Sequence, residues 1–182
     1  MEIYKEKFTS LQKEILRFFF IKSGESFNQR QIALNLNVSP TAIAKSLPAL
    51  EKESLIKLIK KEGDNRILVE LNKDNPLVFN LKRAENLKML YESGLAKYLS
   101  DNFAFTTIIL FGSYSLGEDI ETSDIDLAII GSKEKKLNLE KFEKLLQRKI
   151  SINFYDNLKD IENNLKSNIL NGITLKGGIN LK

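Results

Sequence analysis

Two short motifs in the second half of the chain combine residue types that can bind phosphate and a metal ion. Gly112 and Ser113 follow an apolar run, and ten residues separate them from Asp124-Ile125-Asp126, which opens another apolar run. Side chains alternate along a strand, so Asp124 and Asp126 point to one face. Adjacent carboxylates repel each other unless a cation lies between them, and Mg²⁺ commonly binds one or two carboxylates together with phosphate oxygens. The aspartate pair is therefore a predicted Mg²⁺ site.

Gly112 and Ser113 supply the other half of this predicted site. Glycine lets the backbone approach a ligand closely, and the following amides and the Ser113 hydroxyl can donate to phosphate oxygens. If the two apolar runs are neighbouring strands, a phosphate at Ser113 and a metal at the aspartates belong to one ligand. A second interpretation stays open, in which a plain hairpin carries two solvated aspartates.

The composition narrows the chemistry available to these residues. The 182 residues contain neither Cys nor His, which excludes disulfides, thiolate chemistry, an ordinary zinc site and a histidine base. The N-terminus is charged at Glu2, Lys5 and Glu6, a pattern that disfavours a signal peptide. No apolar run approaches the length of a membrane span. We expect a soluble, cytoplasmic protein with no membrane partner.

The elements that position the two motifs alternate between helix and strand from Pro76 onward. The run 106–111 is rich in β-branched residues and does not alternate, which is typical of a strand buried on both faces. The expected elements are a long helix over 76–99, strands over 106–111, 124–130 and 150–155, helices over 138–149 and 158–170, and a short edge strand over 173–175.

The first part of the chain has a different pattern, and the change near Asn75-Pro76 predicts two domains, 1–75 and 76–182. Apolar spacing predicts three helices, and 55–60 and 66–71 read as two short strands around a turn. Ser39-Pro40 is a predicted N-cap with proline at the first helical position. Three helices and a hairpin form a helix-turn-helix with a wing.

The segment SPTAIAKSLPALEKESLI resembles the recognition helix and wing entry of winged-helix regulators. This resemblance implies binding to duplex DNA, and the candidate DNA-binding residues are Thr41, Lys45, Lys57, Lys60 and Lys61. Pro48 removes an amide donor from the same helix and predicts a kink there. The net charge of +4 is mild, so a docking or dimerisation domain remains the alternative interpretation.

The spacing of Gly112-Ser113 and Asp124-Ile125-Asp126 resembles that of minimal nucleotidyltransferases of the DNA polymerase β-like superfamily. The resemblance covers roughly residues 100–180 and implies an α+β protein, with an N-terminal winged helix-turn-helix followed by a small mixed-sheet nucleotidyltransferase domain. It implies that Gly112 and Ser113 hold a nucleoside triphosphate, with ATP expected. It also implies that Asp124 and Asp126 are the catalytic, metal-binding residues, and that a nucleotide is joined to an acceptor hydroxyl with release of pyrophosphate.

Two departures from the family pattern affect the expected activity. The family usually has a third carboxylate on a following strand, where this chain has Ser151 or Asn153, and Asp156 is out of phase with that face. Many members have a basic residue where this chain has Leu116. Loss of a positioned base typically costs about 10²- to 10⁴-fold in rate. Whether Glu118, Asp119, Glu121 or a partner compensates stays open.

These patterns lead to three alternative functions. The first is an enzyme that transfers a nucleoside monophosphate from a Mg²⁺-bound triphosphate to a hydroxyl of a protein or small molecule. The second is a winged-helix regulator, able to work as a homodimer, with a non-catalytic nucleotide-binding domain. The third is an antitoxin-type protein that binds a partner toxin, since some members of the resembled family adenylylate such a partner. The retained aspartate pair favours the first.

Overall fold

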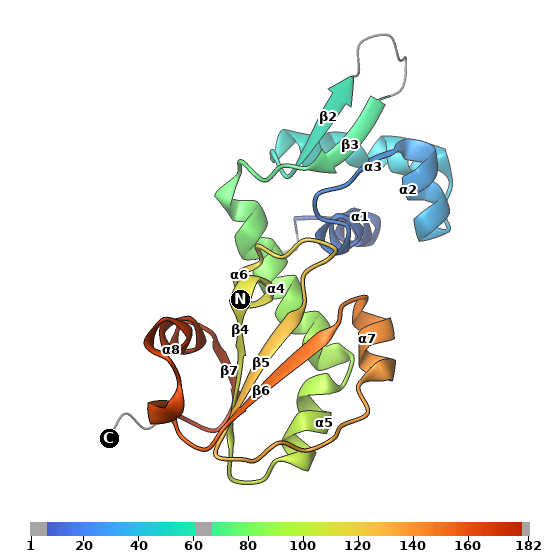
Figure 1. Ribbon diagram of the computed structural model, residues 1–182. Coiled ribbons are helices and arrows are strands. Elements are labelled where there is room, and N and C mark those ends of the chain that lie inside the picture. The colour runs from blue at the N-terminus through green and yellow to red at the C-terminus, as the bar shows by residue number, and fades with distance from the viewer. Residues whose placement is uncertain (1–6, 61–66, 180–182) are drawn as a thin grey trace, which may run out of the picture. The chain divides into compact units, whose positions relative to one another are not determined.

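The computed structural model describes residues 7–60 and 67–179 (Figure 1). The chain divides into two compact units, Met1–Val78 and Phe79–Lys182. The division falls a few residues after the expected boundary at Asn75-Pro76, inside helix α4 (Pro76–Glu92). Each unit has its own sheet.

Within its described residues, 7–60 and 67–78, the first unit contains three complete helices and a three-stranded antiparallel sheet. Its elements are α1 (Ser10–Ile21), β1 (Ser26–Asn28), α2 (Gln29–Leu36), α3 (Pro40–Lys52), β2 (Ile56–Lys60) and β3 (Ile67–Leu71). The strand order is β1-β3-β2. This helix-strand-helix-helix-hairpin order is that of a winged helix, as the sequence pattern predicted. The sequence did not predict β1, which is too short to show an alternation.

Local signals explain where these helices begin. Thr9 and Asn28 each form a capping box with the glutamine three residues later, and Ser39 caps α3 ahead of Pro40. Asn37 adopts a left-handed conformation (φ 54°) that makes the tight turn between α2 and α3. Helix α3 is continuous across Pro48 as far as Lys52.

The second unit is built on a four-stranded mixed sheet in the order β6-β5-β4-β7. Strand β4 pairs antiparallel with β5 and β7, while β5 and β6 are parallel. After α4, the elements are α5 (Leu95–Asn102), β4 (Thr107–Phe111), α6 (Gly112–Leu116), β5 (Ile125–Ile130), α7 (Glu140–Leu146), β6 (Ile150–Tyr155), η1 (Leu158–Asp160), α8 (Asn163–Leu170) and β7 (Ile173–Lys176).

Three expected helices of this unit differ from those observed. The helix predicted over 76–99 is two helices, because Gly94 adopts φ +80° and interrupts the helix just before α5. The helix predicted over 138–149 is the shorter α7, which ends at Gln147 in a left-handed conformation. The helix predicted over 158–170 is a 3₁₀ turn followed by α8.

Both faces of this sheet are covered by helices, which explains the continuous apolar run of β4. One face packs against α4, α5 and α7 through a large buried cluster that includes Leu99, Leu110, Leu127 and Phe142. The other face packs against α8 through Ile109, Phe111, Ala128 and Ile169. Figure 1 shows α8 on one side of the sheet and α5 and α7 on the other.

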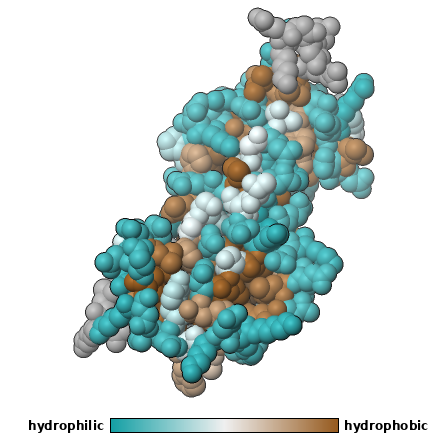
Figure 2. Space-filling model, viewed as in Figure 1, coloured by the Kyte–Doolittle hydropathy of each residue, from teal (hydrophilic) through white to brown (hydrophobic). Residues whose placement is uncertain are grey.

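The surface shown in Figure 2 is mostly hydrophilic, with small groups of hydrophobic residues between the polar ones. Within residues 7–60 and 67–179, none of the helices is both long and apolar enough to cross a membrane.

Candidate active site

Gly112 and Asp126 lie side by side at one end of the second unit's sheet. Phe111, the last residue of β4, pairs with Asp126 of β5, so Gly112 begins α6 next to this carboxylate. Gly112 has φ +70°, and a Cβ atom built there would lie 2.6 Å from Asp126 Oδ2. The close approach of the carboxylate to the backbone therefore requires glycine.

Asp124 and Asp126 interact electrostatically. Asp124 precedes β5 and is exposed, whereas Asp126 is half-buried within the strand. Burial first, and the Asp124 carboxylate second, raise the pKa of Asp126. The second cause is the repulsion expected between two neighbouring carboxylates.

The two aspartates suit a metal ion that a bound ligand also coordinates. They suit less well a metal ion that protein side chains coordinate alone. Among the described residues, no group of three or more His, Cys, Asp or Glu side chains could hold a metal ion. Two carboxylates are sufficient for Mg²⁺ when phosphate oxygens and water complete its coordination. Asp124 and Asp126 therefore fit a metal that arrives with a nucleotide.

The structure distinguishes between the two positions where a third acid was expected. Ser151 of β6 pairs directly with Asp126, whereas Asn153 pairs with Ala128, one step further along the sheet. Paired residues of parallel strands face the same side of the sheet. Ser151 is therefore the residue beside the aspartates. Asp156 follows β6 at the opposite end of the strand, so it cannot replace the missing acid.

The loop between α6 and β5 does not supply a replacement through Asp119. The side chain of Asp119 is only 1% exposed and is paired with Lys82 and Arg148. Its carboxylate is thus already occupied, whereas Glu118 is exposed. Leu116, which stands where a basic residue was expected, is 40% exposed at the end of α6.

A hollow of about 670 Å³ adjoins Asp124, a volume typical of a small-molecule site. Its lining comes from the loop before β5, from α7 and from the segment that leads into β6: Glu121, Thr122, Ser123, Asp124, Glu140, Glu143, Lys144, Gln147, Arg148 and Lys149. No sequence motif marks the α7 residues as part of a site.

In the first unit, most of the described DNA-binding candidates are exposed. Thr41 and Lys45 lie on the exposed face of α3, and Lys60 is exposed at the end of β2. Lys57 instead forms an ion pair with Asp74, and this hydrogen bond raises the pKa of Lys57. Lys61 lies outside the described residues. Thr41, Lys45 and Lys60 are thus exposed, and Lys57 is partly exposed in its ion pair.

Comparison with known proteins identifies the type of domain in the second unit. Residues 92–175 match the family model described as the nucleotidyltransferase domain, so this part of the chain contains a nucleotidyltransferase domain, as its motifs predicted. The match covers less than half of the chain. No curated protein matches the sequence.

Several solved structures resemble part of the chain. A cysteine-to-serine mutant of Lactococcus lactis ZitR is 26% identical, with 58% of this chain and 68% of that chain covered and a TM-score of 0.40. A structure of L. lactis ZitR described as a zinc-responsive MarR family member is 30% identical, covering 56% and 67%, with a TM-score of 0.38. The adhesin competence repressor AdcR from Streptococcus pyogenes is 21% identical, covering 54% and 69%, with a TM-score of 0.40. Because these TM-scores are low, the winged-helix assignment depends on the topology of the first unit.

Proposed function

We propose that the second unit binds a Mg²⁺-bound nucleoside triphosphate, with ATP as the expected nucleotide, and transfers its nucleoside monophosphate to an acceptor hydroxyl. The observation that carries this proposal is the approach of Gly112 to the Asp126 carboxylate, inside a segment that matches the nucleotidyltransferase domain. That contact supports the proposal, because backbone amides can bind phosphate and a neighbouring carboxylate can bind Mg²⁺.

Each residue of the site has a separate part in the proposed reaction. The amides that follow Gly112 and the Ser113 hydroxyl donate to phosphate oxygens. Asp124 and Asp126 hold the divalent cation, which when bound neutralises charge on the phosphates and on the leaving pyrophosphate. The acceptor hydroxyl oxygen then forms a bond to the α-phosphorus as the bond to pyrophosphate breaks, and the hydroxyl proton passes to solvent water. Ser151 is a poor base at neutral pH, so we expect slow transfer.

The acceptor belongs to the same proposal. It is a hydroxyl group on a partner protein, such as a toxin, or on a small molecule. A protein acceptor could also bring the acidic group that Ser151 does not provide.

A thermal shift assay tests nucleotide binding without knowledge of the acceptor. We expect Mg²⁺ with ATP to raise the Tm of the wild-type protein, because a ligand at 100 times its Kd stabilises the folded state by about 2.7 kcal/mol. Mg²⁺ alone, and ATP with a chelator, should give smaller shifts. An unchanged Tm at millimolar Mg²⁺ and each of the common nucleoside triphosphates would contradict the proposal.

The missing third acid can be restored by a single substitution. Ser151→Asp places a carboxylate directly across from Asp126 and is expected to raise the rate of nucleotide transfer at least about tenfold, a conservative part of the usual contribution of a positioned base. The measurement is incorporation of α-labelled nucleotide into the protein or a supplied hydroxyl acceptor. Asn153→Asp is the control, since it adds the same charge one step away from Asp126 and should raise transfer less. Equal effects of the two substitutions would contradict the role given to Ser151.

DNA binding by the first unit is a second candidate function. The specific observation is the exposed face of α3, which presents Thr41 and Lys45 in a winged-helix topology. In such folds this helix enters the major groove and the wing contacts the backbone. A homodimer that reads two half-sites is part of this second proposal.

We expect binding to duplex DNA to be salt-sensitive, because lysines contact its phosphates, and weak, because few of the described lysines are exposed on this face. The double substitution Lys45→Glu with Lys60→Glu should abolish retardation of a duplex at low salt. Each phosphate contact that is lost should lower the slope of log K against log salt by about 0.9. Lys73→Glu is the control, since Lys73 is an exposed lysine of the same unit that lies outside α3 and the wing strands. If the wild-type protein retards no duplex at low salt, the unit is a docking module.

A further inference from the structure

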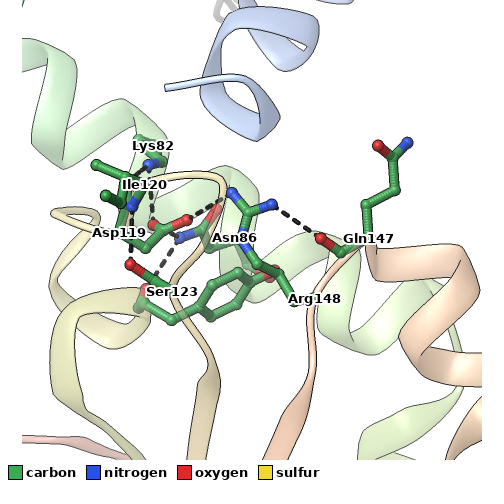
Figure 3. Close-up of polar contacts among 8 residues, drawn as sticks. Lys82, Asn86, Asp119, Ile120, Ser123, Gln147 and Arg148 are labelled. Carbon is green, nitrogen blue, oxygen red and sulfur yellow. Dashed lines mark hydrogen bonds and ion pairs between the residues drawn. The ribbon is translucent and has the colours of Figure 1, made fainter. Parts of the chain in front are cut away.

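A buried polar cluster holds the loop that leads from α6 to the aspartates. It consists of Lys82, Asn86, Asp119 and Arg148 (Figure 3), whose exposed fractions lie between 1% and 5%. Asp119 is buried although both of its neighbours in the loop, Glu118 and Ile120, are exposed. Since ionised side chains are rarely buried without partners, the position of Asp119 is specified by this cluster.

Both carboxylate oxygens of Asp119 are occupied. Oδ1 lies 3.0 Å from Lys82 Nζ and accepts a hydrogen bond of 2.8 Å from Asn86 Nδ2. Oδ2 accepts a hydrogen bond of 3.1 Å from Arg148 Nη2. Lys82 also donates to the backbone carbonyl of Asp119. Charge-assisted hydrogen bonds of this kind fix geometry more strongly than neutral ones, so the side chain and the backbone of the loop are held at the same point.

The cluster also connects the elements that carry the candidate site. Asn86 Nδ2 donates to the carbonyl of Tyr114 at 2.9 Å, in the helix that begins with Gly112 and Ser113. Arg148 lies just before β6, where the carbonyl of Lys149 accepts a hydrogen bond of 2.8 Å from the amide of Ile125. Helix α4 and Asp119 therefore link three elements of the candidate site, which are α6, the start of β5 and the entry to β6.

A short hydrogen-bonded turn connects Asp119 to the metal-binding pair. The amide of Ile120 donates to Ser123 Oγ at 3.0 Å (Figure 3), and Asp124 follows Ser123 directly. Asp126 is held within β5, whereas Asp124 lies in the loop before it, so this loop needs an anchor if the two carboxylates are to stay close enough for one cation.

We infer that Asp119 is a positioning residue for the site: it does not touch the nucleotide, but it fixes Asp124 and Asp126 relative to Gly112 and Ser113. This inference deepens the proposed function and depends on it for its ligand. Outer residues that orient metal ligands typically contribute about 10- to 100-fold to metal affinity. The same size of effect is expected here for Mg²⁺-bound ATP.

The test uses three variants of the full-length chain. Asp119→Asn keeps the shape of the side chain, but it replaces one carboxylate oxygen with an NH₂ group. This group faces the hydrogen-bond donors that surround Asp119. Lys82→Met is milder, because Asp119 keeps its pair with Arg148, and it takes the place of Asp119→Asn if that variant does not fold. Glu118→Gln is the matched control, since it removes one negative charge from the adjacent, exposed position of the same loop.

Two measurements are made at a temperature at which circular dichroism shows each variant to be fully folded. The first is the Kd for ATP in excess Mg²⁺, expected to rise about 10- to 100-fold in Asp119→Asn, less in Lys82→Met, and not in Glu118→Gln. The second is amide hydrogen exchange over residues 120–126 without ligand, expected to be faster in Asp119→Asn and Lys82→Met only.

The two readouts separate the inference from the proposed function. If the wild type does not bind ATP, the proposed function fails, and the exchange measurement alone still decides whether Asp119 fixes the aspartate loop. If the variants show a lower Tm but wild-type Kd and wild-type exchange, the cluster serves stability only and the inference is overturned. Equal effects of Glu118→Gln and Asp119→Asn would overturn it as well, because loop charge and not position would then be the cause.

Discussion

Gly112→Ala is expected to abolish the Tm increase that Mg²⁺ with ATP gives the wild-type protein. A Cβ at residue 112 would lie 2.6 Å from Asp126 Oδ2, a separation that the folded chain cannot keep. Either the Asp126 carboxylate or the start of α6 must move, and a displacement of about 1 Å in a site can cost about 10²-fold. The free energy of unfolding should also fall by about 1–2 kcal/mol, because residue 112 has a left-handed backbone.

Gly94→Ala separates these two causes. Gly94 has a similar backbone angle, φ +80°, but no atom lies within 4 Å of a Cβ built there. The variant should therefore lose a comparable amount of stability while keeping the nucleotide-dependent Tm shift. If Gly112→Ala behaves in the same way as Gly94→Ala, the contact between Gly112 and Asp126 has no part in nucleotide binding.

Much of the fold was predictable because its signals are local. The Ser39-Pro40 helix start and the apolar strands of the second unit both depend on residues close together in sequence. The prediction of one helix over 76–99 was wrong for a physical reason. Leucines continue at helical spacing on both sides of Gly94, so the apolar pattern did not show the interruption that the glycine permits.

The candidate site was predictable only in part. Spacing alone indicated that Gly112 and Asp126 belong together, and the strand register bears out their proximity. Spacing could not choose between Ser151 and Asn153, because that choice depends on the register of β5 against β6, which is set by the whole sheet.

The Asp119 cluster had no sequence signal at all. Its ion pairs join Asp119 to Lys82 and Arg148, which lie 37 and 29 residues away along the chain. The sequence therefore left Asp119 as one of several loop acids that could replace the missing carboxylate. The burial of Asp119 excludes that role, since its oxygens are already bound.

Asp126→Asn is expected to remove the Mg²⁺–ATP-dependent Tm shift without lowering the stability of the ligand-free protein. The carboxylate of Asp126 is the half-buried member of the pair, and in the proposed site its loss would leave the cation with one protein ligand. Asp124→Asn should remove the shift as well. Asp156→Asn, which changes an exposed carboxylate at the opposite end of β6, should keep it.

The pH dependence of the ligand-free protein gives an independent measure of the same carboxylate. Burial, and then repulsion by Asp124, raise the pKa of Asp126 in the folded state. The folded state then binds the proton more tightly than the unfolded chain does. The stability contribution of Asp126 is therefore fully present below the ordinary carboxyl pKa and is lost as the pH rises through the raised value.

Asp126→Asn cannot ionise, so this loss of stability with rising pH should be absent from the variant. Denaturant unfolding of both proteins between about pH 3 and pH 7 measures the difference. At neutral pH the variant should be at least as stable as the wild type, because the repulsion between Asp124 and Asp126 is gone. If Asp126 were instead a structural carboxylate that caps a turn or pairs with a lysine, the result would be reversed. Asp126→Asn would then be less stable than the wild type at neutral pH, and neither protein would bind the nucleotide. The sign of one stability difference thus distinguishes a metal-binding pair from a structural one.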